Sequence, residues 1–307
     1  MITILAGGTG SVKLVRGLAA IRQDVQVIAN VGDNYWLYSL YICPDIDTIV
    51  YGLANLLDTY RGWGIKKDTF NFLRQMEVFS EPTWFRIGDR DAATHLIRTN
   101  MLKNGRNLSS ITKWMCEKFA VGVNIIPVTD NPVETRISTQ KGDMHLQEYW
   151  VKHGGRDPVE GIQYVGVEKA RPNPEAVNAI QHAETVIIAP GNPLTSIGPM
   201  LAMKGIKKEL ARKKQKVVAV SPLIGDDAIT GPAAKYMRAA GMEANAYGLA
   251  KMYSEVCRTM VVDSKDAHLS GKIRSLAYRV LETNITMSDM QAEEALASFI
   301  INNTRLI

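Results

Sequence analysis

The sequence predicts an α/β fold: a Rossmann-like, mostly parallel sheet with helices on both faces, a helical region and a small β-rich insertion. Three observations support this class. Short β-branched runs alternate with helical patterns, the runs are apolar throughout, and turn residues flank them. Strands covered on both faces show such continuous apolar runs, and helices that connect them make the sheet parallel. The expected strands are residues 2–6, 25–31, 123–128, 185–189, 217–220 and 260–262.

Helical patterns fill most of the segment between the second and third expected strands. The apolar residues of segment 47–59 have the spacing of one helix face: Ile49, Val50, Leu53, Leu56 and Leu57. Further helices are expected at residues 67–78, 92–103 and 109–119, and an amphipathic helix that follows Ser288 ends near Ile301. We therefore expect residues 44–120 to form a helical region.

A period-two pattern replaces the helical one between residues 132 and 168. Residues 135–139 and 144–151 alternate polar and apolar side chains, and the turn residues 140–143 separate them. This pattern is typical of an antiparallel hairpin. We expect an insertion within one α/β domain that spans residues 1–307, and not a second domain.

The composition excludes several classes of protein. Of the 307 residues, 46% are hydrophobic and 22% are charged, a globular balance that excludes intrinsic disorder. No apolar run approaches the ~20 residues that a membrane span needs, and the N-terminus lacks the pattern of a signal peptide. Cys43, Cys116 and Cys257 lie far apart without a CxxC spacing, so neither a disulfide framework nor a structural zinc site is expected. We expect a cytoplasmic protein.

The charge balance favours small anionic ligands. Lys and Arg outnumber Asp and Glu by 36 to 31, which gives a formal charge of +5 and a pI near 9.0. This excess suits substrates such as phosphates, but it is too small to favour nucleic acid.

The first candidate site is the turn Gly7-Gly8-Thr9-Gly10, between the first expected strand and a helix that begins near Ser11. Its backbone N–H groups and the helix N-terminus favour a phosphate, and Lys13 adds a positive charge. The dinucleotide fingerprint is incomplete because Lys13 occupies its third glycine position, and the GK[ST] ending of a Walker A loop is absent. A tight turn without a ligand is the alternative. Asp33, after the second strand, is placed to bind a ribose hydroxyl.

The second candidate is the pair Asp45 and Asp47, which follows Pro44 at the start of an expected helix. A helix cap is the alternative for either residue. Beside a phosphate loop, two carboxylates favour Mg²⁺, which takes carboxylate and phosphate oxygens together. Asp47 is also a candidate acceptor for the proton of a substrate hydroxyl.

The third candidate is Gly88-Asp89-Arg90-Asp91, followed by His95. Helix capping with surface ion pairs, and a core-packed or solvated histidine, are the more common interpretations. The charges are nevertheless crowded into one loop, where a ligand or cation would organise them. Trp63, near these acidic motifs, is either a core residue or a stacking surface for a planar ligand. No HExxH, GxSxG or cysteine-nucleophile motif occurs, so covalent catalysis has no candidate.

The fourth candidate lies beyond the fourth and fifth expected strands. Asn192 and Ser196 follow residues 185–189, and Ser221 follows residues 217–220. Ligands in open parallel sheets bind beyond the carboxyl ends of the strands. Amide and hydroxyl donors in two neighbouring loops therefore predict a cleft for a phosphate or a base.

These motifs stand in the order found in the 2-phospho-L-lactate transferase family of coenzyme F-420 biosynthesis, which the chain resembles over nearly its whole length. The family has archaeal and bacterial forms. The motifs that carry the resemblance are Gly7-Gly8-Thr9-Gly10 with Lys13-Leu14, Asn30-Val31-Gly32-Asp33, Cys43-Pro44-Asp45-Ile46-Asp47-Thr48, Arg61-Gly62-Trp63-Gly64, Gly88-Asp89-Arg90-Asp91, His145-Leu146-Gln147-Glu148-Tyr149-Trp150, Asn192-Pro193 with Ser196-Ile197-Gly198-Pro199, and Ser221-Pro222-Leu223-Ile224-Gly225.

The resemblance implies a transfer reaction. A phospho-lactate or phospho-enolpyruvate group would pass from a guanosine diphosphate-linked donor (lactyl- or enolpyruvyl-diphospho-guanosine) to the terminal ribityl hydroxyl of Fo, the deazaflavin 7,8-didemethyl-8-hydroxy-5-deazariboflavin. The products would be coenzyme F-420-0, or its dehydro form, and GMP. The resemblance also implies Mg²⁺ as cofactor, a homodimer, and no nucleic-acid or membrane partner.

The resemblance assigns roles to particular residues. It implies that the nucleotide and its phosphates contact Gly7, Gly8, Thr9, Gly10, Lys13, Asn192, Ser196 and Ser221. It implies that Asp45 and Asp47 hold Mg²⁺, although which of Asp33, Asp45 and Asp47 bind the metal stays open, and that Asp47 and Arg90 are catalytic. It also implies that the helical region of residues 44–120 binds substrate. Fo would contact Asp47, Asp89, Arg90 and Trp63.

Two other functions remain open at this point. A related branch of the same superfamily contains nucleotide-sugar-binding regulators with the same GGTG start, but it generally has a Gly/Ser/Arg-rich segment in place of residues 43–48. An NAD-dependent oxidoreductase would use the same first turn with Asp33 on the ribose, against which the missing third glycine argues. The sequence also leaves open whether the three-carbon acid is lactate, enolpyruvate or another.

Overall fold

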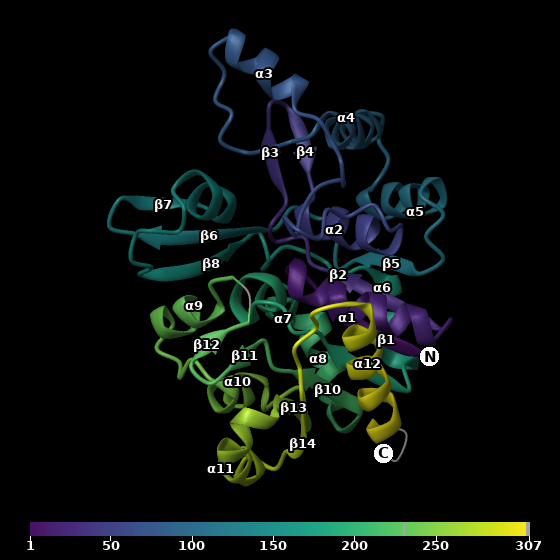
Figure 1. Ribbon diagram of the computed structural model, residues 1–307, viewed down its shortest axis with the longest axis vertical. Coiled ribbons are helices and arrows are strands. Elements are labelled where there is room, and N and C mark those ends of the chain that lie inside the picture. The colour runs from purple at the N-terminus through teal and green to yellow at the C-terminus, as the bar shows by residue number, and fades with distance from the viewer. Residues whose placement is uncertain (230, 305–307) are drawn as a thin grey trace.

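The computed structural model describes residues 1–229 and 231–304, and its centre is a seven-stranded parallel sheet (Figure 1). The strands lie in the order β14-β13-β10-β9-β1-β2-β5, and each neighbouring pair is parallel. Their bounds are β1 (Ile2–Ala6), β2 (Val25–Ala29), β5 (Asn124–Pro127), β9 (Thr185–Ile188), β10 (Val217–Val220), β13 (Thr259–Asp263) and β14 (Arg279–Thr283). The predicted α/β class is confirmed.

Six of these strands match the predicted ones, and the seventh, β14, is absent from the prediction. β14 forms the edge of the sheet, and Leu281 is the one buried residue among its five. Its sequence therefore has no continuous apolar run. In contrast, every residue of β1, β10 and β13 is buried, as expected for strands covered on both faces.

The order of the strands reverses at β1. The chain runs outward from β1 to β2 and β5 on one side, and from β9 to β10, β13 and β14 on the other. The carboxyl ends of β1 and β9 are therefore a topological switch point, where open parallel sheets bind ligands.

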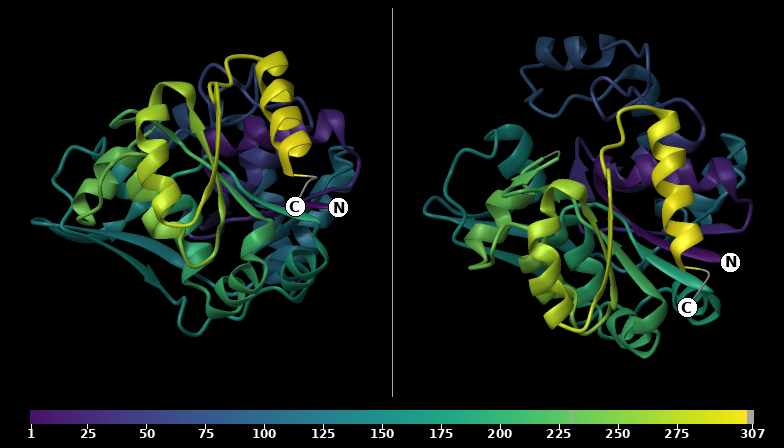
Figure 2. Two further views of the ribbon diagram at one scale, coloured as in Figure 1. Left: turned by 90° about the horizontal axis from the view of Figure 1, so that it is seen from below. Right: turned by 60° about the horizontal axis from the view of Figure 1, so that its bottom comes forward.

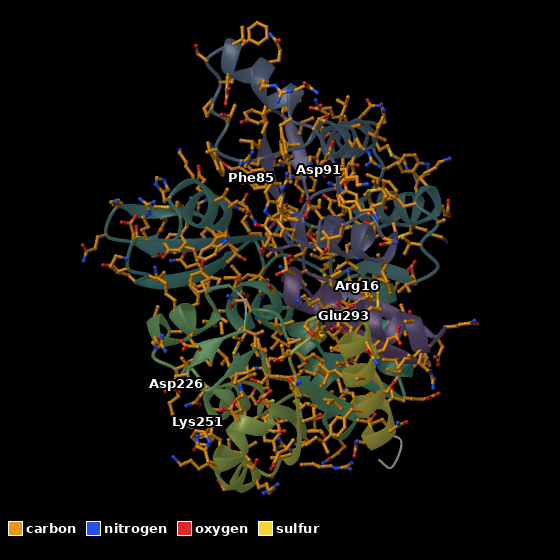
Figure 3. The ribbon with its side chains drawn as sticks, viewed as in Figure 1. Arg16, Phe85, Asp91, Asp226, Lys251 and Glu293 are labelled. Carbon is orange, nitrogen blue, oxygen red and sulfur yellow. The ribbon has the colours of Figure 1, made fainter. Side chains whose placement is uncertain are left out.

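Two helices from opposite ends of the chain pack together on the sheet. α1 (Gly8–Ile21) and α12 (Met290–Thr304) run side by side (Figure 2). Gly17 allows this contact, because a Cβ there would lie 2.3 Å from the backbone oxygen of Glu293. Arg16 pairs with the buried carboxylate of Glu293 across the same contact (Figure 3). α12 ends near the predicted Ile301.

The helical region projects from the carboxyl ends of the strands (Figure 1). It consists of the hairpin β3 (Tyr35–Leu37) and β4 (Leu40–Ile42), then α2 (Pro44–Leu53), α3 (Asn71–Val78), α4 (Asp89–Lys103) and α5 (Leu108–Lys118). The sequence predicts all four helices, but some ends differ. α2 begins at Pro44 and ends well before residue 59, because Asn55 adopts a left-handed φ of 54°. α4 begins three residues early and includes Asp89 and Arg90.

The insertion is a three-stranded antiparallel sheet rather than a hairpin. Its strands are β6 (Glu134–Thr139), β7 (Gly142–His145) and β8 (Gly161–Val165), with β6 in the middle. The predicted second strand, residues 144–151, was wrong beyond His145. The His145 Nδ1 accepts a hydrogen bond from the Gln147 N–H at 3.0 Å, and the chain turns into a short π-helix, η1 (Glu148–Lys152).

The second half of the chain supplies the remaining elements. These are α6 (Pro174–His182), η2 (Pro193–Ile197), α7 (Gly198–Ala202), α8 (Lys204–Arg212), η3 (Lys214–Lys216), β11 (Leu223–Ile224), β12 (Asp227–Ala228), α9 (Ala233–Ala239), α10 (Ala246–Tyr253), η4 (Ser264–Leu269) and α11 (Ser270–Ser275). Buried apolar residues from Ile2 to Ile301 form one cluster. The three cysteines are buried free thiols. Across residues 1–229 and 231–304, no helix is long and apolar enough to cross a membrane.

Candidate active site

The first cavity of the candidate site opens at the switch point between β1 and β9. It encloses about 200 Å³. Five residues that the sequence assigns to nucleotide or phosphate line it: Gly8, Thr9, Gly10, Asn192 and Ser196. Asp33, which follows β2, also lines this cavity. The loops after three neighbouring strands therefore converge here, as the strand order requires.

A second, larger cavity lies beside the first. It encloses about 520 Å³ between the start of α1 and the helical region. Asp47 and Trp63, which the sequence analysis assigned to the acceptor, line it together with Asp45. Four residues line both cavities: Gly8, Thr9, Gln147 and Trp150. Gly8 and Asp47 therefore open into one hollow, and the two cavities are parts of a single crevice.

Hydrogen-bond donors are concentrated in the first cavity. α1 begins at Gly8 without an acidic residue in its first turn, so its positive N-terminal end favours an anion. The Asn192 Oδ1 caps η2 by accepting from the N–H groups of Leu194 and Thr195 at 3.0 and 3.2 Å. Among the described residues, the Asn192 Nδ2 and the Tyr236 hydroxyl are buried without a hydrogen-bond partner. Such donors in a cavity wall are suited to a ligand that supplies acceptors.

Gly7 acts as a spacer rather than as part of the cavity wall. It precedes α1, and a Cβ at this position would lie 2.7 Å from the Asp45 Oδ2 and 2.9 Å from the Ser196 Cβ. The absence of a side chain lets α2, η2 and the end of β1 approach one another. Gly8 has a φ of 76°, a conformation that favours glycine.

Asp33 and Asp45 form a carboxylate pair around one amide. The Asn30 Nδ2 donates to the Asp33 Oδ1 at 3.0 Å and to the Asp45 Oδ2 at 2.9 Å. The Asp45 Oδ1 accepts from the Gly8 N–H at 2.7 Å. Burial raises the pKa of Asp45 to about 6, and the hydrogen bonds from Asn30 and Gly8, which lower this pKa, offset only part of that effect. Burial and the adjacent charge of Asp45 raise the pKa of Asp33 well above its ordinary value.

The pair of Asp33 and Asp45 offers a donor set that suits a divalent cation. Two carboxylates that are costly to ionise together are stabilised by a bound cation. Among the described residues, no three His, Cys, Asp or Glu side chains gather into a metal cluster. Mg²⁺ is commonly held by one or two carboxylates, with water and substrate phosphates completing its shell. The donor set of Asp33 and Asp45, beside a phosphate-type cavity, matches that chemistry.

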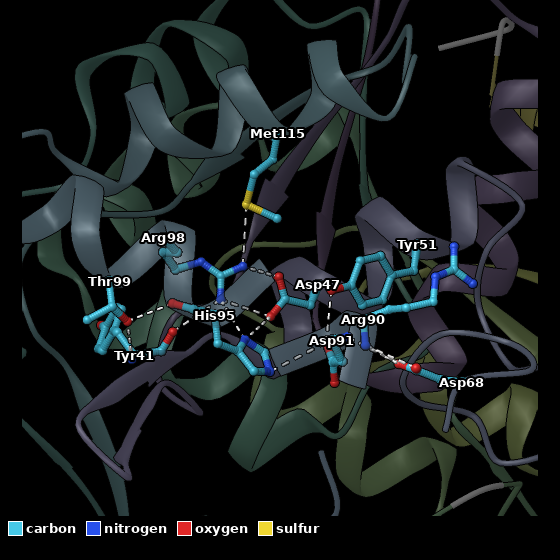
Figure 4. Close-up of polar contacts among 10 residues, drawn as sticks. All are labelled: Tyr41, Asp47, Tyr51, Asp68, Arg90, Asp91, His95, Arg98, Thr99 and Met115. Atoms are coloured by element: carbon cyan, nitrogen blue, oxygen red, sulfur yellow. Dashed lines mark hydrogen bonds and ion pairs between the residues drawn. The ribbon is translucent and has the colours of Figure 1, made fainter. Parts of the chain in front are cut away.

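Asp47 is instead the partner of a buried arginine (Figure 4). The guanidinium of Arg98 contacts both oxygens of its carboxylate, with Nη1 donating to Oδ2 at 3.0 Å. His95 lies beside this pair, with its Nδ1 3.6 Å from the Asp47 Oδ2. Both Asp47 oxygens are therefore engaged by Arg98, and the carboxylate also lines the second cavity.

Aromatic side chains form much of the second cavity. Trp63, Trp84, Phe85 and Trp150 line it. Trp63 is held by Arg61, whose guanidinium carbon lies 5.7 Å from its ring centre. Several rings around one hollow favour a planar aromatic ligand.

Four further residues that the sequence places in the site lie outside both cavities. The Lys13 Nζ donates to the Met287 backbone oxygen at 2.8 Å, next to α12. The Ser221 hydroxyl is used within its own turn, donating to the Leu223 backbone oxygen at 3.0 Å. Asp89 caps α3 by accepting from the Phe72 N–H at 2.7 Å. The exposed Arg90 side chain extends away from Asp47 (Figure 4).

Comparison with known families identifies the chain. A sequence model of the family described as 2-phospho-L-lactate transferase CofD matches residues 2–298. The chain belongs to the 2-phospho-L-lactate transferase CofD family. It is accordingly a transferase, and the resemblance seen in the sequence motifs is confirmed.

Curated relatives of the CofD family cover nearly the whole chain. A 2-phospho-L-lactate transferase from Methanocaldococcus jannaschii is 38% identical over 309 residues, which are 98% of this chain and 97% of that protein. The Methanospirillum hungatei protein of the same name is 38% identical over 89% of this chain and 93% of its own length. A phosphoenolpyruvate transferase from Streptomyces coelicolor is 36% identical over 96% of this chain and 95% of that protein.

A solved structure shares the fold of this CofD-family chain. A protein of the UPF0052 family from Bacillus halodurans superposes with a TM-score of 0.63 and 15% sequence identity, over 97% of this chain and 98% of that one. At this identity the similarity extends to the fold alone.

Sequence reasoning missed several residues of the crevice. Gln147 and Trp150 belong to a motif that resembles the CofD family, but the expected strand 144–151 assigned them no role. Asp91 and His95 belong to the third candidate motif and line the second cavity, whereas the sequence assigned no role to Arg98, which contacts Asp47 from outside that cavity. Tyr236 comes from α9, a helix that the sequence analysis did not predict.

Proposed function

We propose that the chain catalyses the transfer step of coenzyme F-420 biosynthesis for which its family is named. A phospho-lactate or phospho-enolpyruvate group passes from a guanosine diphosphate-linked donor to the terminal ribityl hydroxyl of Fo. The products are coenzyme F-420-0, or its dehydro form, and GMP. The observation that carries this proposal is the single crevice, whose phosphate-type cavity and aromatic cavity share Gly8, Thr9, Gln147 and Trp150.

The first cavity suits the guanosine diphosphate part of the donor. Its diphosphate lies against the N-terminus of α1 at Gly8, Thr9 and Gly10, where the helix end favours negative charge. The unpartnered Asn192 Nδ2 and Tyr236 hydroxyl, both among the described residues, supply further donors for the nucleotide.

The second cavity suits Fo. Its flat ring system lies among Trp63, Trp84 and Trp150, and its ribityl chain extends toward Gly8. The Asp47 carboxylate lines this cavity and accepts a hydrogen bond from the terminal hydroxyl.

The reaction needs no protein nucleophile. The ribityl oxygen forms a bond to the phosphorus that carries the three-carbon acid, the bond from that phosphorus to the GMP oxygen breaks, and the hydroxyl proton is released. The chain's contribution is to hold hydroxyl and phosphorus in line and to exclude water. Asp33 and Asp45 would hold Mg²⁺, which when bound offsets the negative charge of the diphosphate. We further propose that the protein is a cytoplasmic homodimer. Light scattering measures the mass of this assembly.

A turnover assay tests the proposal. The protein is incubated with Mg²⁺, Fo and either lactyl- or enolpyruvyl-diphospho-guanosine, and mass spectrometry detects coenzyme F-420-0, its dehydro form and GMP. We expect one donor to give equal amounts of deazaflavin product and GMP. Binding is measured separately by the deazaflavin fluorescence of Fo.

Two controls address the other functions. NADH and a nucleotide sugar replace the donor in the fluorescence titration, and we expect neither to change the affinity for Fo. Tight binding of a nucleotide sugar without any turnover of Fo would instead favour the regulator branch of the superfamily.

A further inference from the structure

A buried guanidinium lies behind Asp47, on the side away from the second cavity. Arg98 of α4 is 1% exposed and does not line either cavity, whereas Asp47 lines the second one. The Arg98 Nη1 donates to the Asp47 Oδ2 at 3.0 Å and to the Tyr41 backbone oxygen at 3.2 Å, and Nη2 contacts the Asp47 Oδ1 (Figure 4). A two-point contact between a planar guanidinium and a carboxylate fixes the plane of the carboxylate.

His95 supports the same arrangement from the cavity side. Its Nδ1 lies 3.3 Å from the Arg98 Nη1. Arginine only donates, so this contact is a hydrogen bond in the tautomer whose Nδ1 is unprotonated and whose proton is on Nε2. Nε2 faces the Asp91 Oδ1 at 3.4 Å, and that oxygen accepts from the Tyr51 hydroxyl at 2.8 Å. Asp91, His95 and Arg98 therefore form one polar face of α4.

Stability alone does not account for this arrangement. Burying an ion pair removes two charges from water, and apolar residues of similar size are generally as stable or more so. The Arg98 Nε is also buried without a partner among the described residues. Apolar residues in place of Asp47 and Arg98 would not provide a carboxylate that is held in one orientation at the cavity wall.

We propose that Arg98 is a positioning residue, which holds the Asp47 carboxylate in the one orientation that aligns the acceptor hydroxyl with the donor. The proposal rests on the proposed function, because it assigns the hydroxyl of Fo to Asp47. Arg98 itself touches no substrate. A misplacement of about 1 Å in a reacting group lowers a rate by about 100-fold, so the orientation of Asp47 sets the turnover number.

Two substitutions of Arg98 test the proposal. Arg98→Lys keeps the positive charge but loses the planar two-point contact, and Arg98→Met keeps much of the side-chain volume but loses the charge. We expect kcat to fall by about 10-fold in Arg98→Lys and by about 100-fold in Arg98→Met. The KM for the guanosine-linked donor should stay within about 2-fold of wild type, because the first cavity is unchanged. The conservative variant thus rescues part of the lost turnover.

The matched control is Arg16→Met. Arg16 also pairs with a buried carboxylate, Glu293, but between α1 and α12 and outside both cavities. We expect this variant to lose thermal stability and to keep the kcat of wild type. A similar loss of Tm in Arg16→Met and Arg98→Met, with a fall in kcat only in the latter, separates positioning from folding.

The outcomes divide clearly. Wild-type kcat in folded Arg98→Met, or in folded Arg98→Lys, overturns the proposal. The proposal is also overturned if Arg98→Met and Arg16→Met have the same Tm and lose kcat to the same extent. If Arg98→Met fails to fold, Arg98→Lys decides between the two results by itself. Wild-type protein without turnover of Fo would contradict the proposed function rather than the role of Arg98.

Discussion

At the scale of single residues, the carboxylates of Asp33, Asp45 and Asp47 have different surroundings at the crevice. Asp47 is compensated by Arg98, whereas Asp33 and Asp45 share one neutral amide donor from Asn30. Burial raises the pKa of both members of the pair, and Asp45 adds to the effect on Asp33. The uncompensated charge is therefore located at Asp33 and Asp45, where a cation would remove its cost.

The pair predicts a dependence of stability on pH. A raised pKa means that the native state binds the proton more tightly than the unfolded chain. The contribution of this bound proton to the free energy of unfolding is complete at pH values below the ordinary carboxyl pKa of about 4. That contribution is lost as the pH rises through the raised pKa of the pair. We expect Asp33→Asn to increase the free energy of unfolding at pH 7 by about 1 kcal/mol or more without Mg²⁺, and to have little effect at pH 4. The new side-chain amide still offers an oxygen that can accept from Asn30.

Urea unfolding at pH 4, 5, 6 and 7 measures this effect. Mg²⁺ should stabilise wild type at pH 7 and should stabilise Asp33→Asn less. Asp143→Asn, on the exposed end of β7, is the control and should follow wild type at every pH. An Asp33→Asn variant that is less stable than wild type at pH 7 would mean that the pair carries no repulsion.

At the scale of elements, the position of α1 connects stability to the site. The first turn of α1 lines both cavities, and its later turns pack on α12. Gly17 is the closest point of that packing, with no space for a side chain. The backbone of α12 cannot withdraw from a new Cβ as a flexible side chain can.

We expect Gly17→Ala to lower the free energy of unfolding by about 2 kcal/mol, because the added methyl group separates two packed helices. Thermal unfolding with circular dichroism measures the loss. Gly271→Ala is the matched control, since a Cβ at that position of α11 meets no atom within 4 Å, and it should be neutral or slightly stabilising. Equal stability of Gly17→Ala and wild type would show that the α1–α12 contact is loose.

The sequence predicts where helices and strands lie better than it predicts which side chains contact one another. The apolar runs and helical stripes locate the buried strands and the helices, because both patterns reflect burial. The edge strand β14 was not predicted, because most of its residues are at least partly exposed and its sequence resembles that of a loop. The contact of Arg98 with Asp47 was not predicted either. An arginine in a helix is usually solvated, and only the fold shows that this one faces Asp47.

At the scale of the whole molecule, the strand order explains why distant motifs meet. Because the chain reverses direction at β1, the loops after β1, β2 and β9 come to one point. Gly8, Asp45, Asn192 and Ser196, which the sequence analysis singled out in separate motifs, all line this crevice. The sequence could not show that the Lys13 side chain reaches Met287 or that Asp89 caps α3, because those contacts depend on how the helices pack.

The central claim is that donor and acceptor bind side by side in one crevice with a cation at Asp33 and Asp45. A crystal structure with Fo, guanosine diphosphate and Mn²⁺ tests it most directly, since Mn²⁺ is located by its anomalous scattering. We predict the diphosphate at Gly8–Gly10, the deazaflavin ring beside Trp63, and a Mn²⁺ peak within about 2.5 Å of oxygens of Asp33 and Asp45. Fo and guanosine diphosphate on separate faces of the molecule, or Mn²⁺ bound away from both aspartates, would contradict the account.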